Sequence, residues 1–201
     1  MQWILLHWIA RGTTSEDAMT NFGIALANMH QQPQPYFGWY RDNYIGSLRQ
    51  INTQYNSWPE FYTTCRIIPL VKMLFDKAVF SKSDTERASA FCKKLEVLFP
   101  TEPPALLHGD LWNGNYIIDT SGTAVIFDPA VYHGHREMDL GMSKLFGGFS
   151  NAFYDAYQQA YPLENGWQQR LPLTQLYPLL VHAVLFGGHY ITNAREIMRK
   201  F

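Results

Sequence analysis

Apolar residues recur along most of the chain at the three- and four-residue spacing of amphipathic helices. Phe22, Leu26 and Met29 follow a capping signal at residues 14–17 and predict a helix that ends near His30. The later stretches with helical periodicity cover residues 58–77, 83–98, 137–146, 150–161 and 167–201. The chain is therefore expected to be mainly helical.

Local signals set the expected ends of these helices. Pro69 is expected to kink the helix over residues 58–77. Ser83 with Glu86 three residues later has the pattern of a capping box, which predicts that the next helix begins at Ser83. Glycine pairs at 147–148 and 187–188 are expected to break the C-terminal helices.

The pattern changes after Pro100. Apolar runs at residues 116–118 and 124–127 flank a turn with Gly122, which predicts a β-hairpin. Residues 31–56 are rich in proline, glycine and aromatic residues, and we expect a loop too long to be a plain connector. The predicted fold class is α+β, mostly α, with one small hairpin.

The first ten residues are apolar, yet they do not form a signal peptide. They lack a basic start, carry His7 in the middle, and reach Arg11 without a small-residue cleavage site. No window supplies the roughly 20 apolar residues of a transmembrane helix. We expect a short buried strand here, at a point where a longer protein has been interrupted.

Composition narrows the range of partners. Lys and Arg total 16 against 17 Asp and Glu, for a net charge of −1, and 47% of the residues are hydrophobic. This balance argues against disorder and against charge-driven binding of nucleic acid or anionic membranes. The two cysteines, Cys65 and Cys92, have no metal or redox spacing, which favours the reducing cytoplasm.

Polar residues flank the predicted hairpin where its packing does not require them. His108 and Asp110 precede it, Asn115 enters its first strand, and Asp128 leaves its second. Turn chemistry alone explains Asp and Asn beside Gly, but the joint spacing H-x-D-x-x-x-x-N…D favours phosphoryl transfer. Asp110 would accept the proton of the attacking hydroxyl, and Asn115 and Asp128 would bind Mg²⁺. His108 is expected to hold the loop.

Residues 107–115 (LHGDLWNGN) resemble the catalytic loop of the fructosamine kinase, or ketosamine-3-kinase, family of aminoglycoside-phosphotransferase-like kinases. Trp112 is the discriminating position, since relatives that act on aminoglycosides or choline usually carry another residue there. Residues 128–140 resemble the magnesium segment of the same family and the helix after it. The likeness extends to residues 42–48, 145–149 and 154–157.

The resemblance implies a protein-kinase-like fold and ATP-dependent phosphorylation of the O3′ hydroxyl of fructosamines or ribulosamines, including glycated lysine, in deglycation repair. Asp110 would be the catalytic base, and Trp112 would contact the sugar. Asn115 and Asp128 would hold Mg²⁺ and with it the nucleotide. The hinge would bind adenine through the backbone of Leu6, His7, Trp8 and Ile9.

The segment after Asp128 contains further charged and titratable residues that could lie near this loop. Glu137 and Asp139 are better explained as buried partners of the catalytic loop than as catalysts. His133 and His135 form an H-x-H pair, but without a third ligand nearby they are expected to be loop histidines.

Such a kinase also needs a glycine-rich loop and a lysine for the phosphates, and the sequence offers neither before the hinge. We therefore expect residues 1–9 to be a remnant of the hinge strand. Residues 10–201 would form the C-terminal lobe, with the catalytic loop and metal hairpin at 105–130. This truncated chain would be inactive alone. The alternatives are a non-catalytic kinase-like remnant or binding module, and an aminoglycoside or choline kinase.

Overall fold

The structure, a computed structural model, describes residues 7–201, about half of them helical. The helices are α1 (Glu16–His30), α2 (Trp58–Phe61), the π-helical turn η1 (Tyr62–Ile67), α3 (Ile68–Asp76), α4 (Lys82–Cys92), α5 (Leu95–Leu98), α6 (Glu137–Leu145), α7 (Asn151–Ala160), α8 (Trp167–Phe186) and α9 (His189–Lys200). The strands are β1 (Asn43–Ile45), β2 (Leu48–Gln50), β3 (Ala105–Leu107), β4 (Tyr116–Ile118), β5 (Ala124–Ile126) and β6 (Tyr132–Gly134). The expected α+β fold, mostly helical, is confirmed.

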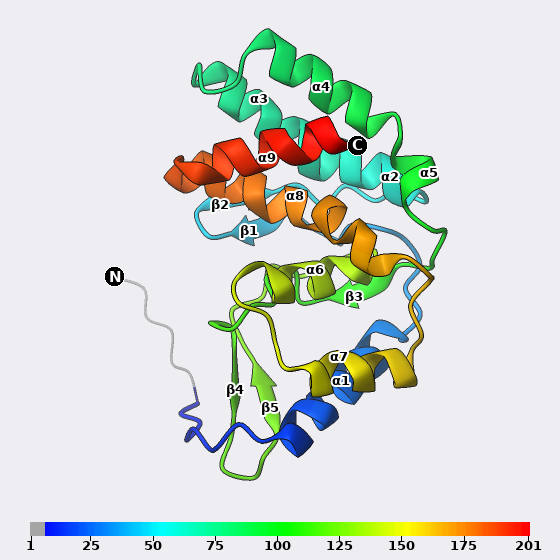
Figure 1. Ribbon diagram of the computed structural model, residues 1–201, viewed down its shortest axis with the longest axis vertical. Helices are drawn as coiled ribbons and strands as arrows, with labels where there is room; N and C mark the ends of the chain where they lie inside the picture. The colour runs from blue at the N-terminus through cyan, green and yellow to red at the C-terminus, as the bar shows by residue number, and fades with distance from the viewer. Residues whose placement is uncertain (1–6) are drawn as a thin grey trace.

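Helix α6 lies in the middle of the molecule, between two hydrophobic cores (Figure 1). One core gathers α2–α5, α8, α9 and the β3–β6 pair, and the other gathers α1, α7 and β4. Met138 belongs to the first core and Leu140 to the second, because residues two apart point about 200° away from each other around a helix. Residues 137–143 are all buried, so the carboxylates of Glu137 and Asp139 also face the interior.

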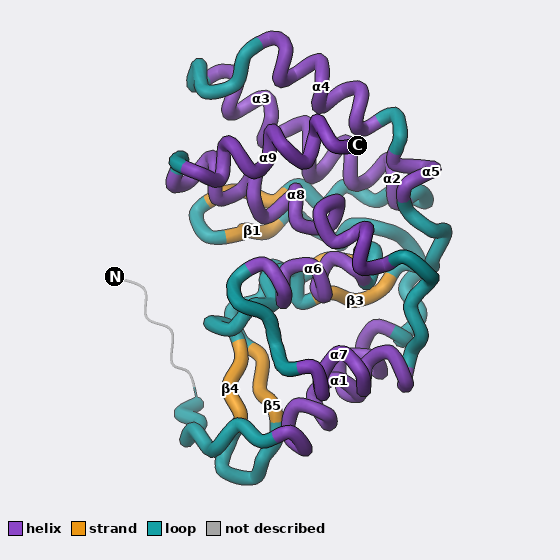
Figure 2. Tube along the Cα trace, viewed as in Figure 1, coloured by secondary structure: helices purple, strands orange, loops and turns teal. Residues whose placement is uncertain are grey.

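Three antiparallel pairs of short strands connect these helices: β1 with β2, β3 with β6, and β4 with β5 (Figure 2). The hairpin expected around Gly122 is the β4–β5 pair, with Tyr116 opposite Ile126. The pairs β1–β2 and β3–β6 were not expected. The first lies inside residues 31–56, which the sequence pattern presented as a loop, and the second joins segments far apart in the chain.

The interruption near Pro69 differs from the expected kink. The helix changes to a π-helical turn at residues 62–67, and Pro69 lies in the first turn of α3. Proline has no backbone N–H, so Pro69 cannot donate the α-helical hydrogen bond to the carbonyl of Cys65, four residues earlier. The Arg66 guanidinium donates to that carbonyl over 3.2 Å instead.

The N-cap of helix α4 lies two residues before the expected one, Ser83. Ser81 is the N-cap, and its hydroxyl accepts from the backbone N–H of Asp84, whose carboxylate in turn accepts from the N–H of Ser81. The expected box of Ser83 and Glu86 is therefore two residues too late in the sequence. The glycine breaks are confirmed, since α6 ends before Gly147 and α8 ends before Gly187.

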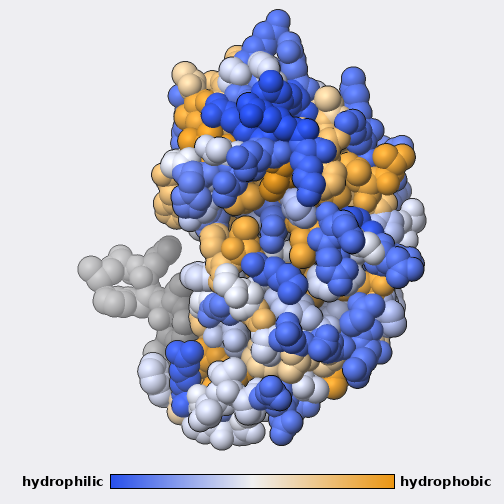
Figure 3. Space-filling view, in the orientation of Figure 1, coloured by the Kyte–Doolittle hydropathy of each residue, from blue (hydrophilic) through white to orange (hydrophobic). Residues whose placement is uncertain are grey.

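The expected buried strand at the start of the chain is wrong over residues 7–10, and residues 1–6 lie outside the described part. Residues 7–10 have no regular secondary structure, and Trp8 is 86% exposed. The chain then runs along the edge of β4, where the N–H of Gly12 donates to the carbonyl of Ile118 over 2.7 Å. The surface mixes hydrophilic and hydrophobic residues over the face in Figure 3. Within residues 7–201, no helix is long and apolar enough to cross a bilayer.

Candidate active site

The loop between β3 and β4 carries the H-G-D sequence and turns sharply at Gly109. This glycine has a φ of +81°, and a Cβ atom there would lie 2.1 Å from the carbonyl oxygen of Ala130. Any other residue would clash with this backbone and would also be strained. Gly109 thus lets the loop pass directly beside the segment that follows β5.

Asp139 of α6 holds this loop from the inside. Its carboxylate accepts hydrogen bonds from the backbone N–H of His108 at 2.8 Å and of Gly109 at 2.9 Å, and His30 lies 3.3 Å from one of its oxygens. The other ring nitrogen of His30 contacts the hydroxyl of Tyr157 at 2.8 Å. Burial would raise the pKa of Asp139, but the hydrogen bonds from His30 and Gly109 outweigh it and lower that pKa.

His108 has the structural role expected for it. Its ring is buried, with Nε2 3.0 Å from the carbonyl of Phe127, and its Nδ1 faces the N–H of Asp110 at 3.3 Å. The imidazole therefore joins the H-G-D loop to the end of β5.

The carboxylate of Asp110 is held in place by Asn115. The Asn115 side-chain amide donates to the backbone carbonyl of Asp110 at 2.8 Å and to its Oδ2 at 3.0 Å. Burial raises the pKa of Asp110 against the lowering effects of His108 and Asn115, and the nearby charge of Asp128 raises it further. A carboxylate with a raised pKa is a better proton acceptor than one in water.

Asn115 and Asp128 lie next to each other because the β4–β5 hairpin pairs their strands. The N–H of Phe127 donates to the carbonyl of Asn115 over 3.1 Å, which places Asp128 one residue beyond this contact. Asp128 is exposed and adopts a left-handed backbone with a φ of +55°, a conformation that Asp tolerates better than most residues. Strain of this kind is concentrated at functional sites.

The two side chains are of a type that suits a magnesium ion. The amide nitrogen of Asn115 is used by Asp110, while its Oδ1 has no hydrogen-bond partner among the described residues. This free carboxamide oxygen and the exposed carboxylate of Asp128 are hard oxygen donors. Mg²⁺ typically takes one or two such protein ligands and completes its shell with water and phosphate oxygens.

Residues 42–52 support the segment after Asp128 through a polar network that the sequence pattern did not reveal. The side-chain amide of Asn43 donates to the carbonyl of Val131 at 2.7 Å, and that of Gln50 donates to the carbonyl of Ala130 at 3.0 Å. Asn52 joins the network by donating to Asn43 over 2.8 Å. The segment that was expected as a loop is thus a scaffold for the site.

A fully buried cation, Arg66, closes this network from behind. Its guanidinium donates to Oδ1 of Asn52 at 2.7 Å and lies over the ring of Tyr132, 4.1 Å from its centroid. Hydrogen bonds and aromatic faces together offset the cost of burying this charge, although its Nε has no hydrogen-bond partner among the described residues.

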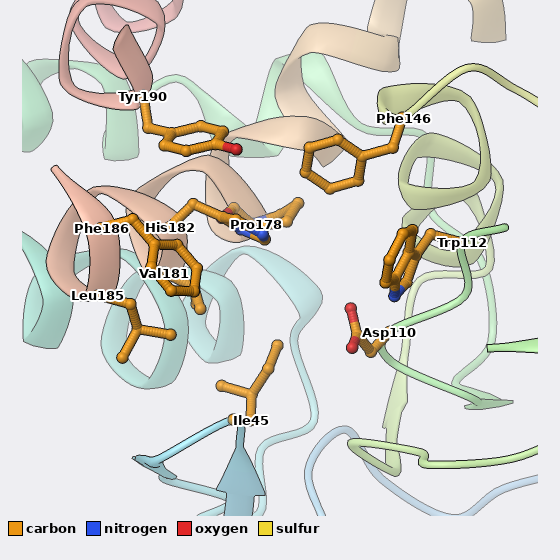
Figure 4. A pocket seen from close by; sticks show the side chains of 11 residues that line it. Ile45, Asp110, Trp112, Phe146, Pro178, Val181, His182, Leu185, Phe186 and Tyr190 are labelled. Carbon is orange, nitrogen blue, oxygen red and sulfur yellow. The ribbon is translucent and has the colours of Figure 1, made fainter. Parts of the chain in front are cut away.

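Asp110 opens into a cavity of about 420 Å³. Figure 4 shows Asp110 and Trp112 on one side of it and the residues of α8 on the other. The lining residues are Ile45, Gly46, Asp110, Trp112, Phe146, Pro178, Val181, His182, Leu185, Phe186 and Tyr190. A concave, mostly apolar cavity with a few polar groups is the usual form of a small-molecule site.

Trp112, the residue expected to contact the sugar, lies in the same cavity as Asp110. Trp112 is 36% exposed as a residue, and its ring meets that of Phe146 edge to face with 5.8 Å between the centroids. The indole lies against Gly114, where a Cβ atom would come within 2.4 Å of the ring. The close approach of this glycine sets the orientation of the indole.

His182 is a lining residue that sequence reasoning missed. Its Nδ1 contacts the carbonyl of Pro178 at 2.8 Å, and its positive form would lower the pKa of Asp110. The available signal was a single titratable residue in the apolar run of residues 178–186. This apolar run predicts the helix, but it does not indicate that His182 faces the loop that carries Asp110.

The expected hinge residues that the structure describes do not line this cavity. Leu6 is outside the described residues, and His7, Trp8 and Ile9 do not line the cavity. Asn115 and Asp128 do not line it either, although Asn115 contacts Asp110, which does.

The other charged residues have structural partners. Asp139 holds the catalytic loop as expected, but Glu137 pairs with Arg170, at 3.0 and 3.2 Å from its Nε, and not with the loop. His133 lies in strand β6 and is not a loop histidine, whereas His135 lies in the connection between β6 and α6, as expected, where it is buried 3.7 Å from Glu102. Among residues 7–201, no three His, Cys, Asp or Glu side chains are grouped to hold a metal.

The model of the fructosamine kinase family matches residues 1–201. The chain belongs to this family, which is a family of kinases. A probable ketoamine kinase of Lactiplantibacillus plantarum is 44% identical over 201 residues, covering 99% of this chain and 71% of the relative. A chloroplastic protein-ribulosamine 3-kinase of Oryza sativa subsp. japonica is 37% identical over 203 residues, covering 97% of this chain and 57% of the relative.

Solved structures agree with this assignment. A crystal structure assigned as a fructosamine-3-kinase of Thermobifida fusca superposes with a TM-score of 0.90 at 40% identity, covering 96% of this chain and 67% of that one. An amicoumacin kinase has a TM-score of 0.59 at 14% identity, which shows a shared kinase-like fold only. The chain thus spans about two-thirds of the relatives whose structures it matches.

Proposed function

We propose that this protein transfers the γ-phosphate of ATP to the O3′ hydroxyl of the sugar in fructosamines and ribulosamines. The observation that carries the proposal is the position of Asp110, a partly buried carboxylate at the boundary between a small-molecule cavity and two free oxygen ligands. Named relatives that act on ketoamines and ribulosamines support the choice of substrate.

Asp110 is the base of the proposed reaction. A sugar hydroxyl in the cavity would donate its hydrogen bond to the Asp110 carboxylate and pass its proton to it as the oxygen attacks. Asn115 holds Oδ2 of Asp110, which leaves Oδ1 to face the substrate. The hydrogen bonds that the Asp139 carboxylate accepts from the backbone of His108 and Gly109 keep the Asp110 carboxylate at a fixed distance from the hydroxyl.

Asn115 and Asp128 are the proposed ligands of Mg²⁺. A bound Mg²⁺ neutralises charge on the phosphate oxygens during transfer. We further propose that the backbone of residues 6–9 contacts the adenine. Trp112 would stack on the sugar, because an exposed indole beside a general base offers the apolar face that a sugar ring covers.

The proposed substrates include small ketosamines and glycated lysine side chains, and the reaction would begin their deglycation. We place the protein in the cytoplasm, in keeping with two cysteines that form no disulfide.

The test uses the protein expressed from its own gene, with fructosyl-amine and ribulosyl-amine substrates and product detected by ³¹P NMR. Asp110→Asn keeps the shape of the side chain and removes the base, so transfer should fall at least about 100-fold while nucleotide binding changes little. Asp155→Asn, an exposed site on α7, is the matched control and should keep full activity.

Two results would count against the proposal. Phosphorylation of an aminoglycoside or choline, with none of any ketosamine, would reassign the substrate. Equal loss of transfer and of nucleotide binding in Asp110→Asn would make Asp110 a structural residue.

A further inference from the structure

The end of the cavity that lies opposite Asp110 is apolar. Figure 4 shows Asp110 and Trp112 on one side and Val181, Leu185 and Phe186 on the other. The latter three come from the last turns of α8, and Ile45 of β1 closes the floor between the two sides. No lysine or arginine is among the lining residues in the described part of the chain.

The middle of the cavity is an aromatic wall around His182. The imidazole lies 5.1 Å from the ring of Phe146, 4.9 Å from that of Tyr190 and 5.5 Å from that of Phe186, measured between centroids. Its Nδ1 is engaged with the carbonyl of Pro178, which fixes the ring against α8. Polar groups are therefore confined to the Asp110 side and the centre.

This division sets the direction in which a ketosamine fits. The hydroxyl to be phosphorylated must lie at Asp110, and the sugar between Trp112 and His182. The amine nitrogen then points away from Asp110, and its substituent meets Val181, Leu185 and Phe186. We propose that the enzyme selects ketosamines whose amine carries an apolar hydrocarbon chain and discriminates against those with a carboxylate close to the amine.

The proposal rests on the proposed kinase function and adds the class of amine to it. An apolar chain would be removed from water against the α8 side chains, which favours binding by about two- to fourfold for each CH₂ group that is covered. A carboxylate at the same place would lose its water without meeting a cation, and it would face the charge of Asp110. The cavity volume lies in the range of ordinary small-molecule sites.

Fructosyl adducts of methylamine, butylamine and hexylamine test the apolar contact. A matched pair of adducts, of 4-methylpentylamine and of 4-aminobutyrate, tests the charge, because their amine substituents have nearly the same shape. The lysine side chain presents the same hydrocarbon as a free alkylamine, so the adduct of Nα-acetyl-lysine amide is included. The values of kcat/KM are measured with ATP, and the Kd values are measured without it by calorimetry.

We expect kcat/KM and binding to increase about tenfold from methylamine to butylamine. The 4-aminobutyrate adduct should be at least about tenfold poorer than its 4-methylpentylamine match. If the natural substrates are glycated lysines of proteins, the kcat/KM of the lysine amide adduct should match that of the alkyl adducts. If they are small glycated amines, the kcat/KM of the free alkylamine adducts should be higher than that of the lysine amide adduct. Either result supports the preference for an apolar chain.

Equal kcat/KM across the alkyl series, or a preference for 4-aminobutyrate, would overturn the inference while leaving the kinase function intact. Phosphorylation of none of the adducts would refute the proposed function. In that case the Kd values still test whether the alkyl chain contacts the apolar end of the cavity. Kd values that do not change with chain length would overturn this contact as well.

A pair of variants adds an independent readout. Phe186 is 68% exposed, so Phe186→Lys should fold and should place a cation at the apolar end. We expect Phe186→Lys to raise the ratio of kcat/KM for the 4-aminobutyrate adduct to kcat/KM for the 4-methylpentylamine adduct by about tenfold or more. Val97→Lys adds the same charge on the exposed face of α5, outside the cavity, and should leave the ratio unchanged. An identical ratio in both variants would contradict the inference.

Discussion

Asp139 accepts hydrogen bonds from two consecutive amides of the catalytic loop, and no other residue type supplies two acceptors in this position so compactly. In Asp139→Asn, one oxygen is replaced by an NH₂ group that faces a backbone N–H. The loop should then shift, and kcat should fall by about 10- to 100-fold while KM for the sugar changes little. Steady-state kinetics, with circular dichroism as a check of folding, measures this.

His30 and Tyr157 extend the same support, since they fix the carboxylate of Asp139 from the side away from the loop. Asp155→Asn again serves as the control for an exposed aspartate in the same part of the protein. If Asp139→Asn kept wild-type kcat, the loop would be held by its other contacts, such as those of His108.

At the scale of the element, the start of α4 shows how a short capping motif decides a helix boundary. Ser81 and Asp84 bond reciprocally, whereas Ser83 is exposed and caps nothing. We expect Ser81→Ala to lower the free energy of unfolding by about 1 kcal/mol and Ser83→Ala to change it little. Urea denaturation of both variants measures the difference, and equal effects would show that the cap is not at Ser81.

The β4–β5 hairpin could be predicted because its signals are local: two apolar runs, a turn with Gly122, and polar residues at fixed spacing around it. Asp110, Asn115 and Asp128 therefore came together as expected. The β3–β6 pair could not be predicted, because each strand has three residues and the partner lies about 27 positions away. Such pairing depends on contacts between segments far apart in the chain, which no local pattern encodes.

For the whole molecule, acid should be a strong destabilising condition. Burial would raise the pKa values of Asp84, Glu102 and Asp139, but Arg195, Arg136 and His30, respectively, outweigh it and lower them. A lowered folded-state pKa gives stability that is present above the ordinary value near 4 and is lost as pH falls through the folded value. The free energy of unfolding should therefore drop between about pH 5 and pH 2.

Glu102→Gln tests the ion pair between Glu102 and Arg136, in which the guanidinium donates to both carboxylate oxygens at 2.8 Å. The variant should be less stable than the wild type at pH 7, and the difference should shrink as pH falls. Glu196→Gln, on an exposed face of α9, is the control. Parallel stability curves for Glu102→Gln and the wild type would show that this pair does not contribute.

Sequence patterns also failed for the cavity, and for a related reason. Its base lies in the β3–β4 loop, and its apolar end lies in α8, so the site exists only after residues 110 and 186 are brought together. Helical periodicity showed which residues of α8 are apolar, but not that part of its last turns faces a cavity instead of the core.

The position of α6 between the two cores has a consequence for how the protein unfolds. Each core needs one side of this helix, so neither half can lose its packing without exposing the face that the other half uses. Hydrogen exchange of the amides in α1 and in α8 should therefore report a single opening event of similar free energy, with no stable half-folded species. The catalytic loop, anchored on α6, would open only with the whole.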